Sequence, residues 1–251
     1  MRSIRAAGIL AAAVALAAPA RSAPIVVNGG FEAPAVKAST EFGSRFGGQV
    51  VPGWTSAGYT FLYRSGAADA GGALTEYGPG RELWGPGNGS ANGLPAASPS
   101  GGDYIAANGA HYPGPLAQTV KGLNPGSVAV VTFWWAGAQE RGFLGDTTEA
   151  WSVSLGGETQ STEVLSNPSR GFTGWRRAAL SFVATGTSEV LSFLAVGTPS
   201  GVPPFVLLDG VAVTQVPEPA SMAVLGAALL AVGLANRRRS RRSRRDFGAP
   251  A

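Results

Sequence analysis

The 251-residue sequence contains no cysteine, a single histidine and only 14% charged residues. The absence of cysteine excludes disulfides, a thiol nucleophile, an iron–sulfur cluster and a cysteine zinc site. With His111 alone, a zinc site that needs two histidines is excluded, and a histidine-centred catalytic triad has one candidate base. The sequence also lacks a Gly-x-Ser-x-Gly elbow and a P-loop, so it carries neither of these hydrolase and nucleotide-binding signatures.

The formal net charge of +4 belongs to the two ends of the chain. Three arginines lie before residue 24 and seven follow residue 236, whereas residues 24–216 contain nine basic and thirteen acidic residues. The part long enough to fold is therefore mildly acidic, and we expect no nucleic-acid partner there. Its apolar residues can supply a core, so we expect one domain over residues 24–215.

Residues 1–23 predict a secretory signal peptide, which makes the secretion machinery an expected partner. Arg2 and Arg5 form a basic start, Ala6 to Ala18 is an uncharged apolar run, and Ala20 supplies a small residue for cleavage. The alternative is an N-terminal membrane anchor, but this run is short for a span of about 20 residues.

Residues 216–251 have three ordered parts. Pro217, Glu218 and Pro219 precede an uncharged run at 220–235, and an arginine cluster follows that includes Arg237, Arg238, Arg239, Arg241 and Arg242. As a helix the run would rise about 24 Å, and flanking arginines could snorkel to complete a membrane span. The arginines would form a cytoplasmic stop, which places the folded domain outside.

This ending resembles the PEP-CTERM sorting signal of exopolysaccharide-producing Gram-negative bacteria. The resemblance implies export across the inner membrane, transient anchoring by the C-terminal helix, and processing at the Pro217–Pro219 motif by an exosortase. The protein would then reside in the cell envelope or outside the cell. An ordinary C-terminal anchor that is never cleaved is the alternative.

Short apolar runs between residues 24 and 215 favour an all-β, antiparallel sandwich. Gly, Pro, Asn or Ser interrupts nearly every run within about a dozen residues. The run at 128–135 is apolar on both faces, which suits a central strand. The expected strands are Ile25–Val27, Tyr59–Tyr63, Tyr104–Ala107, Ala117–Lys121, Val128–Ala136, Ala150–Leu155, Arg177–Ala184, Glu189–Val196 and Phe205–Thr214.

Several phrases of this region resemble jelly-roll, galactose-binding-like and carbohydrate-binding modules. They are Asn28-Gly-Gly-Phe-Glu32, Val51-Pro-Gly-Trp54, the segment 116–126 and Leu207-Leu-Asp-Gly-Val211. The resemblance implies a jelly-roll β-sandwich and a structural calcium ion held by Glu32 and Asp209. Period-two counting places Asp209 on one strand face with Phe205, Leu207, Val211 and Val213. The alternative is that Asp209 only accepts backbone N–H bonds.

A polysaccharide ligand would be bound by aromatic faces stacked on sugar rings. Tyr77 precedes a glycine-rich segment, 78–93, and Trp84 lies within it; the segment is either a mobile surface insertion or a binding loop, and these two aromatic residues are the favoured glycan-binding residues. The other candidates are Tyr59, Tyr63, Tyr104, Tyr112 and Trp151. The remaining tryptophans flank or lie within apolar strands and are expected in the core: Trp54, Trp134, Trp135 and Trp175.

Glycoside hydrolysis would need two carboxylates at a defined separation. The acids in or near expected loops are Glu76, Glu82, Glu140, Asp146 and Glu149, and their spacing selects no pair. We therefore expect solvated loop acids and a non-catalytic exported protein that contacts exopolysaccharide or envelope glycans. The alternatives are an extracellular structural or adhesion protein that binds other proteins, and a wall-active glycosidase.

Overall fold

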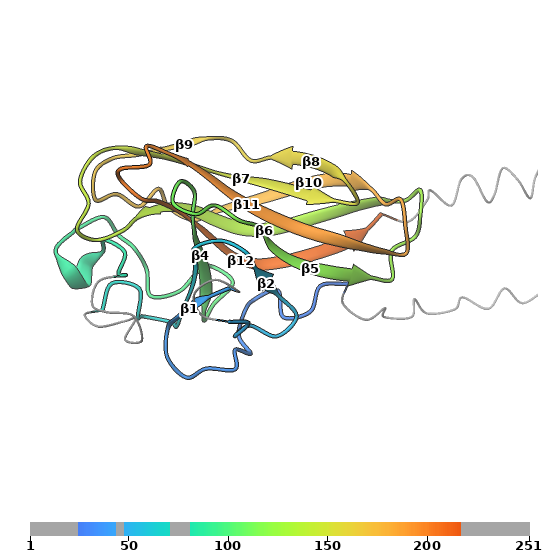
Figure 1. The fold of residues 1–251 in the computed structure, drawn as a ribbon, viewed down its shortest axis with the longest axis horizontal. Coiled ribbons are helices and arrows are strands. Elements are labelled where there is room, and N and C mark those ends of the chain that lie inside the picture. The colour runs from blue at the N-terminus through green and yellow to red at the C-terminus, as the bar shows by residue number, and fades with distance from the viewer. Residues whose placement is uncertain (1–24, 44–47, 71–80, 217–251) are drawn as a thin grey trace, which may run out of the picture.

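The computed structural model describes residues 25–43, 48–70 and 81–216, which form two packed antiparallel sheets (Figure 1). The first sheet has the order β1 (Thr40–Phe42), β3 (Thr60–Tyr63), β4 (Tyr104–Asn108), β12 (Pro204–Gln215), β6 (Val128–Gln139) and β10 (Arg176–Val183). The second has the order β2 (Thr55–Ser56), β5 (Leu116–Lys121), β11 (Ser188–Thr198), β7 (Thr147–Leu155) and β8 (Glu158–Ser161), with β9 (Leu165–Asn167) also paired to β7. The expected all-β sandwich is confirmed, and the described residues contain no α-helix beyond the 3-10 turn η1 (Pro86–Asn88).

The expected strands match the structure except at Ile25–Val27, where the prediction is wrong. There the backbone of Val27 pairs with a side chain instead of a strand: Val27 N–H donates to Gln118 Oε1 at 2.7 Å, and Gln118 Nε2 donates to the Val27 carbonyl at 2.8 Å. The short strands β1, β2, β8 and β9 are not among the expected strands. The turn expected at Asn124-Pro-Gly is present, with Gly126 at φ 86° and Ser127 N–H bonded to the Asn124 carbonyl at 3.0 Å.

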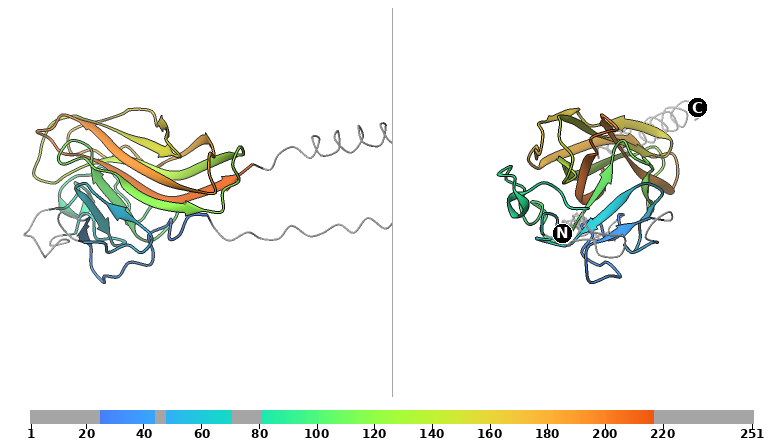
Figure 2. Two further views of the ribbon diagram at one scale, coloured as in Figure 1. Left: turned by 45° about the vertical axis from the view of Figure 1, so that its right-hand side comes forward. Right: turned by 60° about the vertical axis from the view of Figure 1, so that its left-hand side comes forward.

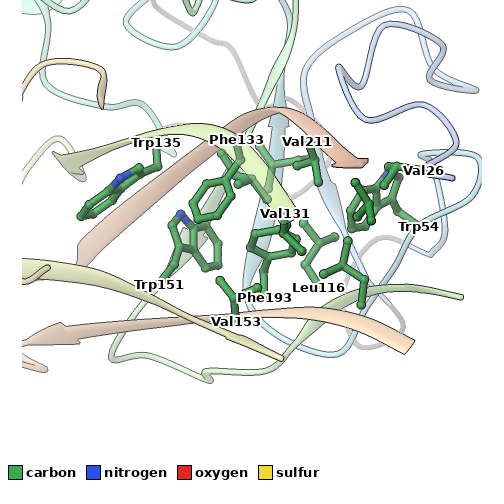
Figure 3. Packing of buried hydrophobic residues seen from close by; sticks show 14 of the residues in the cluster. Val26, Trp54, Leu116, Val131, Phe133, Trp135, Trp151, Val153, Phe193 and Val211 are labelled. Atoms are coloured by element: carbon green, nitrogen blue, oxygen red, sulfur yellow. The ribbon is translucent and has the colours of Figure 1, made fainter. Parts of the chain in front are cut away.

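The core lies between the sheets and is rich in aromatic rings (Figure 3). Three aromatic rings pack around Phe193 on β11. The distances between ring centroids are 5.1 Å to Phe133, 5.8 Å to Trp151 and 6.2 Å to Trp54. The prediction that Trp54 and Trp135 are core residues is confirmed. The proposal of Trp151 as a sugar-stacking residue is wrong, because it is fully buried and its indole N–H donates to the Leu207 carbonyl at 3.0 Å.

A β-bulge in β12 changes which side chains share a face. The register of β12 on β6 shifts between Asp209 and Ala212, next to Gly210 at φ 60°. Before the bulge, Phe205 and Leu207 face away from the second sheet, whereas Val211 and Val213 after it enter the core. The period-two prediction of a single face is therefore wrong, since the extra residue reverses the alternation.

No helix of the described residues is both long and apolar enough to cross a membrane. The signal peptide predicted at residues 1–23 and the helix predicted at residues 220–235 lie outside the described part of the chain, as does the arginine cluster.

Candidate functional site

The outer face of the first sheet, which points away from the second sheet, gathers most of the remaining aromatic residues. One half of this face is covered and forms a second apolar cluster that includes Phe61, Tyr63, Tyr104 and Phe205. Tyr63 and Tyr104 are almost completely buried, and Tyr59 is buried at the edge of the cluster. These three tyrosines were candidates for sugar stacking, but in this structure their rings are not open to a ligand.

The cover over this half includes residues 81–94, so the interpretation of the glycine-rich segment as a mobile insertion is wrong for its described part. Trp84 N–H donates to the Gln139 carbonyl at 2.9 Å, and Arg141 N–H donates to the Glu82 carbonyl at 2.7 Å. Two ion pairs join the same two segments: Arg81 with Glu140 at 3.0 Å, and Arg141 with Glu82 at 2.6 Å. Leu83, between the paired residues, is fully buried.

Two of the acids expected to be solvated are buried by this contact, which corrects that prediction. Glu82 and Glu140 are each 3% exposed and paired with arginine. Burial raises the pKa of Glu140 above its ordinary value, and the adjacent Arg81 offsets only part of this increase. Glu41, which also lies within the electrostatic reach of Arg81, has a pKa raised by burial.

The remaining candidate acids are also not placed as a solvated pair. Glu149 is fully buried on β7, while Asp146 accepts a hydrogen bond from Ser169 N–H at 3.0 Å. Glu76 lies outside the described residues. No pair of these acids faces a shared open surface in the described part of the chain.

Trp84 is half-buried at the rim of the covered half. Its indole N–H donates to the Phe143 carbonyl at 3.0 Å, and the guanidinium of Arg170 lies 4.8 Å from the ring centroid. One face of the indole is thus already occupied by a cation. Tyr77 lies outside the described residues, so glycan binding by Tyr77 and Trp84 stays a prediction.

The other half of the outer face is open, and Trp134 is its largest side chain. Trp134 on β6 is half-buried, and the strand alternation directs it away from the core that holds Phe133 and Trp135. Its cross-strand neighbours are Arg177 on β10 and Asp209 on β12. We call this surface the open face; its residues are Val130, Thr132, Trp134, Arg177, Ala179, Ser181, Ala212 and Thr214.

The chemistry of the open face suits a polyhydroxylated ligand. An exposed indole presents an apolar surface to the C–H faces of a sugar ring. Arg177 is exposed and forms no salt bridge with another described residue, so its guanidinium can donate hydrogen bonds to hydroxyl or carboxylate oxygens. Thr132, Ser181 and Thr214 add hydroxyl groups.

The expectation that Trp134 and Trp175 are core residues is wrong for Trp134, whereas Trp175 packs against the second apolar cluster. Both are half-buried on the outer face, where Trp175 packs edge-on against Tyr104 with ring centroids 5.4 Å apart. An apolar strand with two adjacent tryptophans must direct one indole to each face. The alternation of side chains along a strand therefore predicted that Trp134 and Trp135 lie on opposite faces of the sheet. It did not predict which of the two faces would be covered.

Glu32 and Asp209, the predicted calcium ligands, approach each other around Gly30. A Cβ built on Gly30 would lie 3.7 Å from Glu32 Cγ and 3.9 Å from Asp209 Oδ1. Asp209 is fully buried and accepts hydrogen bonds from Ser98 Oγ and, at 2.6 Å, from Gly210 N–H. Glu32 is exposed and accepts the Asp103 N–H at 2.9 Å.

The electrostatics of this site are unbalanced toward negative charge. Burial, helped by the charges of Glu32 and Asp103, raises the pKa of Asp209 to about 7, although the hydrogen bonds from Ser98 and Gly210 act to lower it. Arg64 offsets part of the charge through Asp103, at 3.0 Å. The described residues contain no group of three or more Asp, Glu or His arranged to hold a metal ion, so a cation here would need backbone carbonyls as well.

The model of the PEP-CTERM protein-sorting motif matches residues 215–239. The chain carries a PEP-CTERM sorting motif. The motif begins at Gln215, the last residue of β12, and includes the expected Pro217, Glu218 and Pro219.

Curated proteins yield no match to the chain, but solved structures do. TmCBM61 in complex with beta-1,4-galactotriose is 16% identical, with a TM-score of 0.44, and the match covers 78% of this chain and all of that one. The N-terminal cellulose-binding domain of Cellulomonas fimi beta-1,4-glucanase C is 15% identical (TM-score 0.33, 66% of this chain and 91% of that one). The CBM22-1 xylan-binding domain of Paenibacillus barcinonensis Xyn10C is 15% identical (TM-score 0.34, 74% of this chain and all of that one). Each TM-score lies below 0.5, so these likenesses carry no argument about a ligand.

Proposed function

We propose that the protein is an exported, exosortase-processed envelope or extracellular protein whose jelly-roll sandwich binds polysaccharide without catalysing a reaction. The sorting motif at residues 215–239 supports export and membrane-linked processing. In this proposal residues 1–23 are removed after secretion, residues 220–235 cross the inner membrane of a Gram-negative cell, and the arginines from Arg237 onward hold the tail in the cytoplasm.

The observation that supports glycan binding is the position of Trp134 on the open face. A half-buried indole beside an exposed arginine that has no salt bridge to another described residue, surrounded by small and hydroxyl-bearing side chains, is a platform on which a sugar ring can stack. Arg177 would bind ring hydroxyls, or the carboxylate of an acidic sugar. The absence of catalysis is proposed because Glu82 and Glu140 are held by arginines and Glu149 is fully buried.

Replacing Trp134 by alanine is expected to weaken retention of the protein on its polysaccharide roughly thirtyfold, because an aromatic anchor at the centre of an interface contributes about 2 kcal/mol. The measurement is affinity electrophoresis or glycan pull-down against polysaccharide from the producing cells. The melting temperature of the variant would be recorded alongside, to separate lost binding from lost folding.

Tyr112→Ala is the matched control, since Tyr112 is an aromatic residue, 45% exposed, outside the open face. Its retention should equal that of the natural protein. Loss of retention in Trp84→Ala or Tyr77→Ala, with Trp134→Ala unchanged, would place the site on the glycine-rich loop. Absence of saturable retention in the natural protein would favour a protein-binding adhesion role instead.

A structural calcium ion at Glu32 and Asp209 is proposed as a second feature of the domain. The two carboxylates beside Gly30 repel each other, and a divalent cation held by them and by backbone carbonyls would neutralise this charge. Calcium at a hundred times its dissociation constant would then add about 3 kcal/mol to the free energy of unfolding.

The expected result is a calcium-dependent rise in melting temperature that EDTA reverses and that Glu32→Ala abolishes. Glu163→Ala serves as the control, because Glu163 is an exposed acid in a surface ion pair with Arg176. A melting temperature that is the same in calcium and in EDTA would contradict the site, and would leave Asp209 as an acceptor of protein hydrogen bonds only.

A further inference from the structure

The open face continues along the outer side of the first sheet toward the end where β12 finishes, opposite the end that carries η1 (Figures 1 and 2). Strand alternation places three exposed valines on this continuation: Val128, Val183 and Val216. The open face and these valines together form a strip across β10, β6 and β12. Arg177 carries the only exposed charge on this strip, and all its other exposed side chains are aliphatic, aromatic or hydroxyl groups.

The guanidinium of Arg177 forms no hydrogen bond or ion pair with another described residue. The next arginine on the same strand is arranged differently. Arg176 points to the other face of β10, and its guanidinium is 3.0 Å from the carboxylate of Glu163. Arg177 therefore keeps all its N–H donors and its full charge for a group that the described part of the chain does not supply.

The acids at the border of the strip do not neutralise Arg177. Asp209 lies across β6, so that the backbones of β10 and β12 are about 10 Å apart. Asp209 is fully buried, and both its carboxyl oxygens accept hydrogen bonds from neighbouring groups. Glu158, beyond the far end of β10, accepts hydrogen bonds from the side chain of Gln160 and from the backbone of the strand.

Trp134 separates the two sides of this row. A Cβ built on Gly210 would lie 3.1 Å from Trp134 Cδ1 and 2.7 Å from Ser100 Oγ, so protein atoms fill the side of the indole toward β12. The side toward β10 holds Arg177, the cross-strand partner of Trp134. Because cross-strand Cβ atoms are only about 5 Å apart, the guanidinium can reach a group that projects from a ring stacked on the indole.

The chemistry of a guanidinium favours one kind of projecting group over the others. A carboxylate accepts two parallel N–H bonds from a guanidinium, and the paired charges make these bonds roughly twice as strong as bonds to a neutral hydroxyl. A neutral sugar would leave the charge of Arg177 without a counter-charge. The geometry therefore distinguishes between the two ligands that the proposed function leaves open for Arg177.

We propose that the open face selects polysaccharides with carboxylated sugars, with a uronate ring stacked on Trp134 and its carboxylate paired with Arg177. This inference rests on the glycan binding given under the proposed function and adds the charge of the ligand. The carboxylate points toward β10 and away from the acidic site at Glu32 and Asp209, which would repel it. The rest of the strip contacts uncharged parts of the polymer.

The test compares two forms of one polymer. Extracellular polysaccharide from the producing cells is used as extracted, and also after carbodiimide and borohydride have reduced its carboxylates to alcohols. Binding of the full chain, purified in a neutral detergent, is measured by affinity electrophoresis in low salt. We expect the extracted polymer to bind about tenfold more tightly than the reduced polymer, which is the effect of one hydrogen-bonded charge pair. Sodium chloride at about 0.5 M should narrow this difference, because it screens exposed charges.

Arg177→Gln should bind the extracted polymer about tenfold more weakly and the reduced polymer as the natural protein does, so that it no longer discriminates between them. Arg176→Gln is the matched control, since it removes the same charge one residue away on the other face of β10. It should bind both polymers as the natural protein does. An equal loss in the two variants would indicate general attraction to a polyanion and would overturn the inference.

The remaining outcomes separate this inference from the proposed function. If the natural protein binds both polymers equally and Trp134→Ala still weakens binding, the open face binds neutral sugars, and only the present inference is contradicted. Discrimination that persists in Arg177→Gln also contradicts the inference alone. If the natural protein shows no saturable binding to either polymer, the proposed function is contradicted, and the inference with it.

Discussion

Replacing Glu149 by glutamine is expected to remove the share of the stability loss between pH 4.5 and pH 7 that comes from this one buried carboxyl group. Glu149 is fully buried at the end of the core, and Thr147 Oγ1 donates to its Oε1. Its Oε2 has no hydrogen-bond partner among the described residues and occupies the space beside Gly137, where a Cβ would lie 2.5 Å from it. Burial raises the pKa from 4.5 to about 7, against the lowering effect of bonds from Thr147 and Asn167.

The direction of the pH dependence follows from this pKa. A carboxyl group with a pKa higher in the folded protein than in the unfolded chain binds its proton more tightly in the folded state. The free energy of unfolding therefore falls as the pH rises from 4.5 through about 7, by roughly 3 kcal/mol for this one group. Glutamine keeps the shape of the protonated group and cannot ionise, so Glu149→Gln should be more stable above pH 7 by up to about that amount.

Urea unfolding at pH 5 and pH 8 measures the effect, which should correspond to a difference in melting temperature of about 10 °C at pH 8. Glu163→Gln is the control, since an exposed ion pair contributes at most about 1 kcal/mol. If the two variants show the same pH dependence, Glu149 does not contribute to it.

The strands of this fold could be predicted because most of them are locally encoded. The run at 178–184 places Leu180 and Phe182 on one face and Ser181 on the other, and the structure has Phe182 in the core and Ser181 exposed. The Asn124-Pro-Gly turn also formed as expected, since its chemistry needs no distant partner. The prediction of a strand at Ile25–Val27 was wrong because it depended on a distant partner. The side chain of Gln118, 91 residues away, forms the hydrogen bonds of Val27 that a neighbouring strand would otherwise form.

The site depends on contacts that leave no local signal in the sequence. Glu82 and Glu140 look like loop acids until segments 59 residues apart pair and bring arginines to them. Whether a tryptophan lies in the core is set by strand register and by the segment that crosses the face, not by its neighbours in sequence. Trp151 is buried because its parity directs it between the sheets, whereas Trp134, in an equally apolar run, faces outward.

Replacing Gly29 by alanine is expected to be far more damaging than the same change at the adjacent Gly30. A Cβ on Gly29 would collide with the carbonyl oxygen of Val211 and lie 3.0 Å from its carbonyl carbon. The same backbone segments are joined by a hydrogen bond of 2.9 Å from Val211 N–H to the Gly29 carbonyl. A Cβ on Gly30 meets nothing closer than 3.7 Å, which is ordinary contact.

Neither glycine has a positive φ, so the two substitutions differ only in space. Gly29→Ala must push the N-terminal segment away from β12, and the lost hydrogen bond together with the overpacking should cost about 3 kcal/mol. That cost corresponds to a fall in melting temperature of roughly 10 °C for a domain of this size. Gly30→Ala should melt within about 2 °C of the natural protein, because it adds one methyl group in free space.

Circular dichroism melts of the two alanine variants measure this contrast directly. Val26 and Phe31, on either side of the glycine pair, lie in the core, so the close approach of Gly29 to Val211 is what seats this segment against the bulge of β12. Similar melting temperatures for the two variants would show that the segment is held only by its buried side chains. A large fall for Gly29→Ala alone would show that the N-terminal segment closes the sandwich through its backbone, which explains the glycine at position 29.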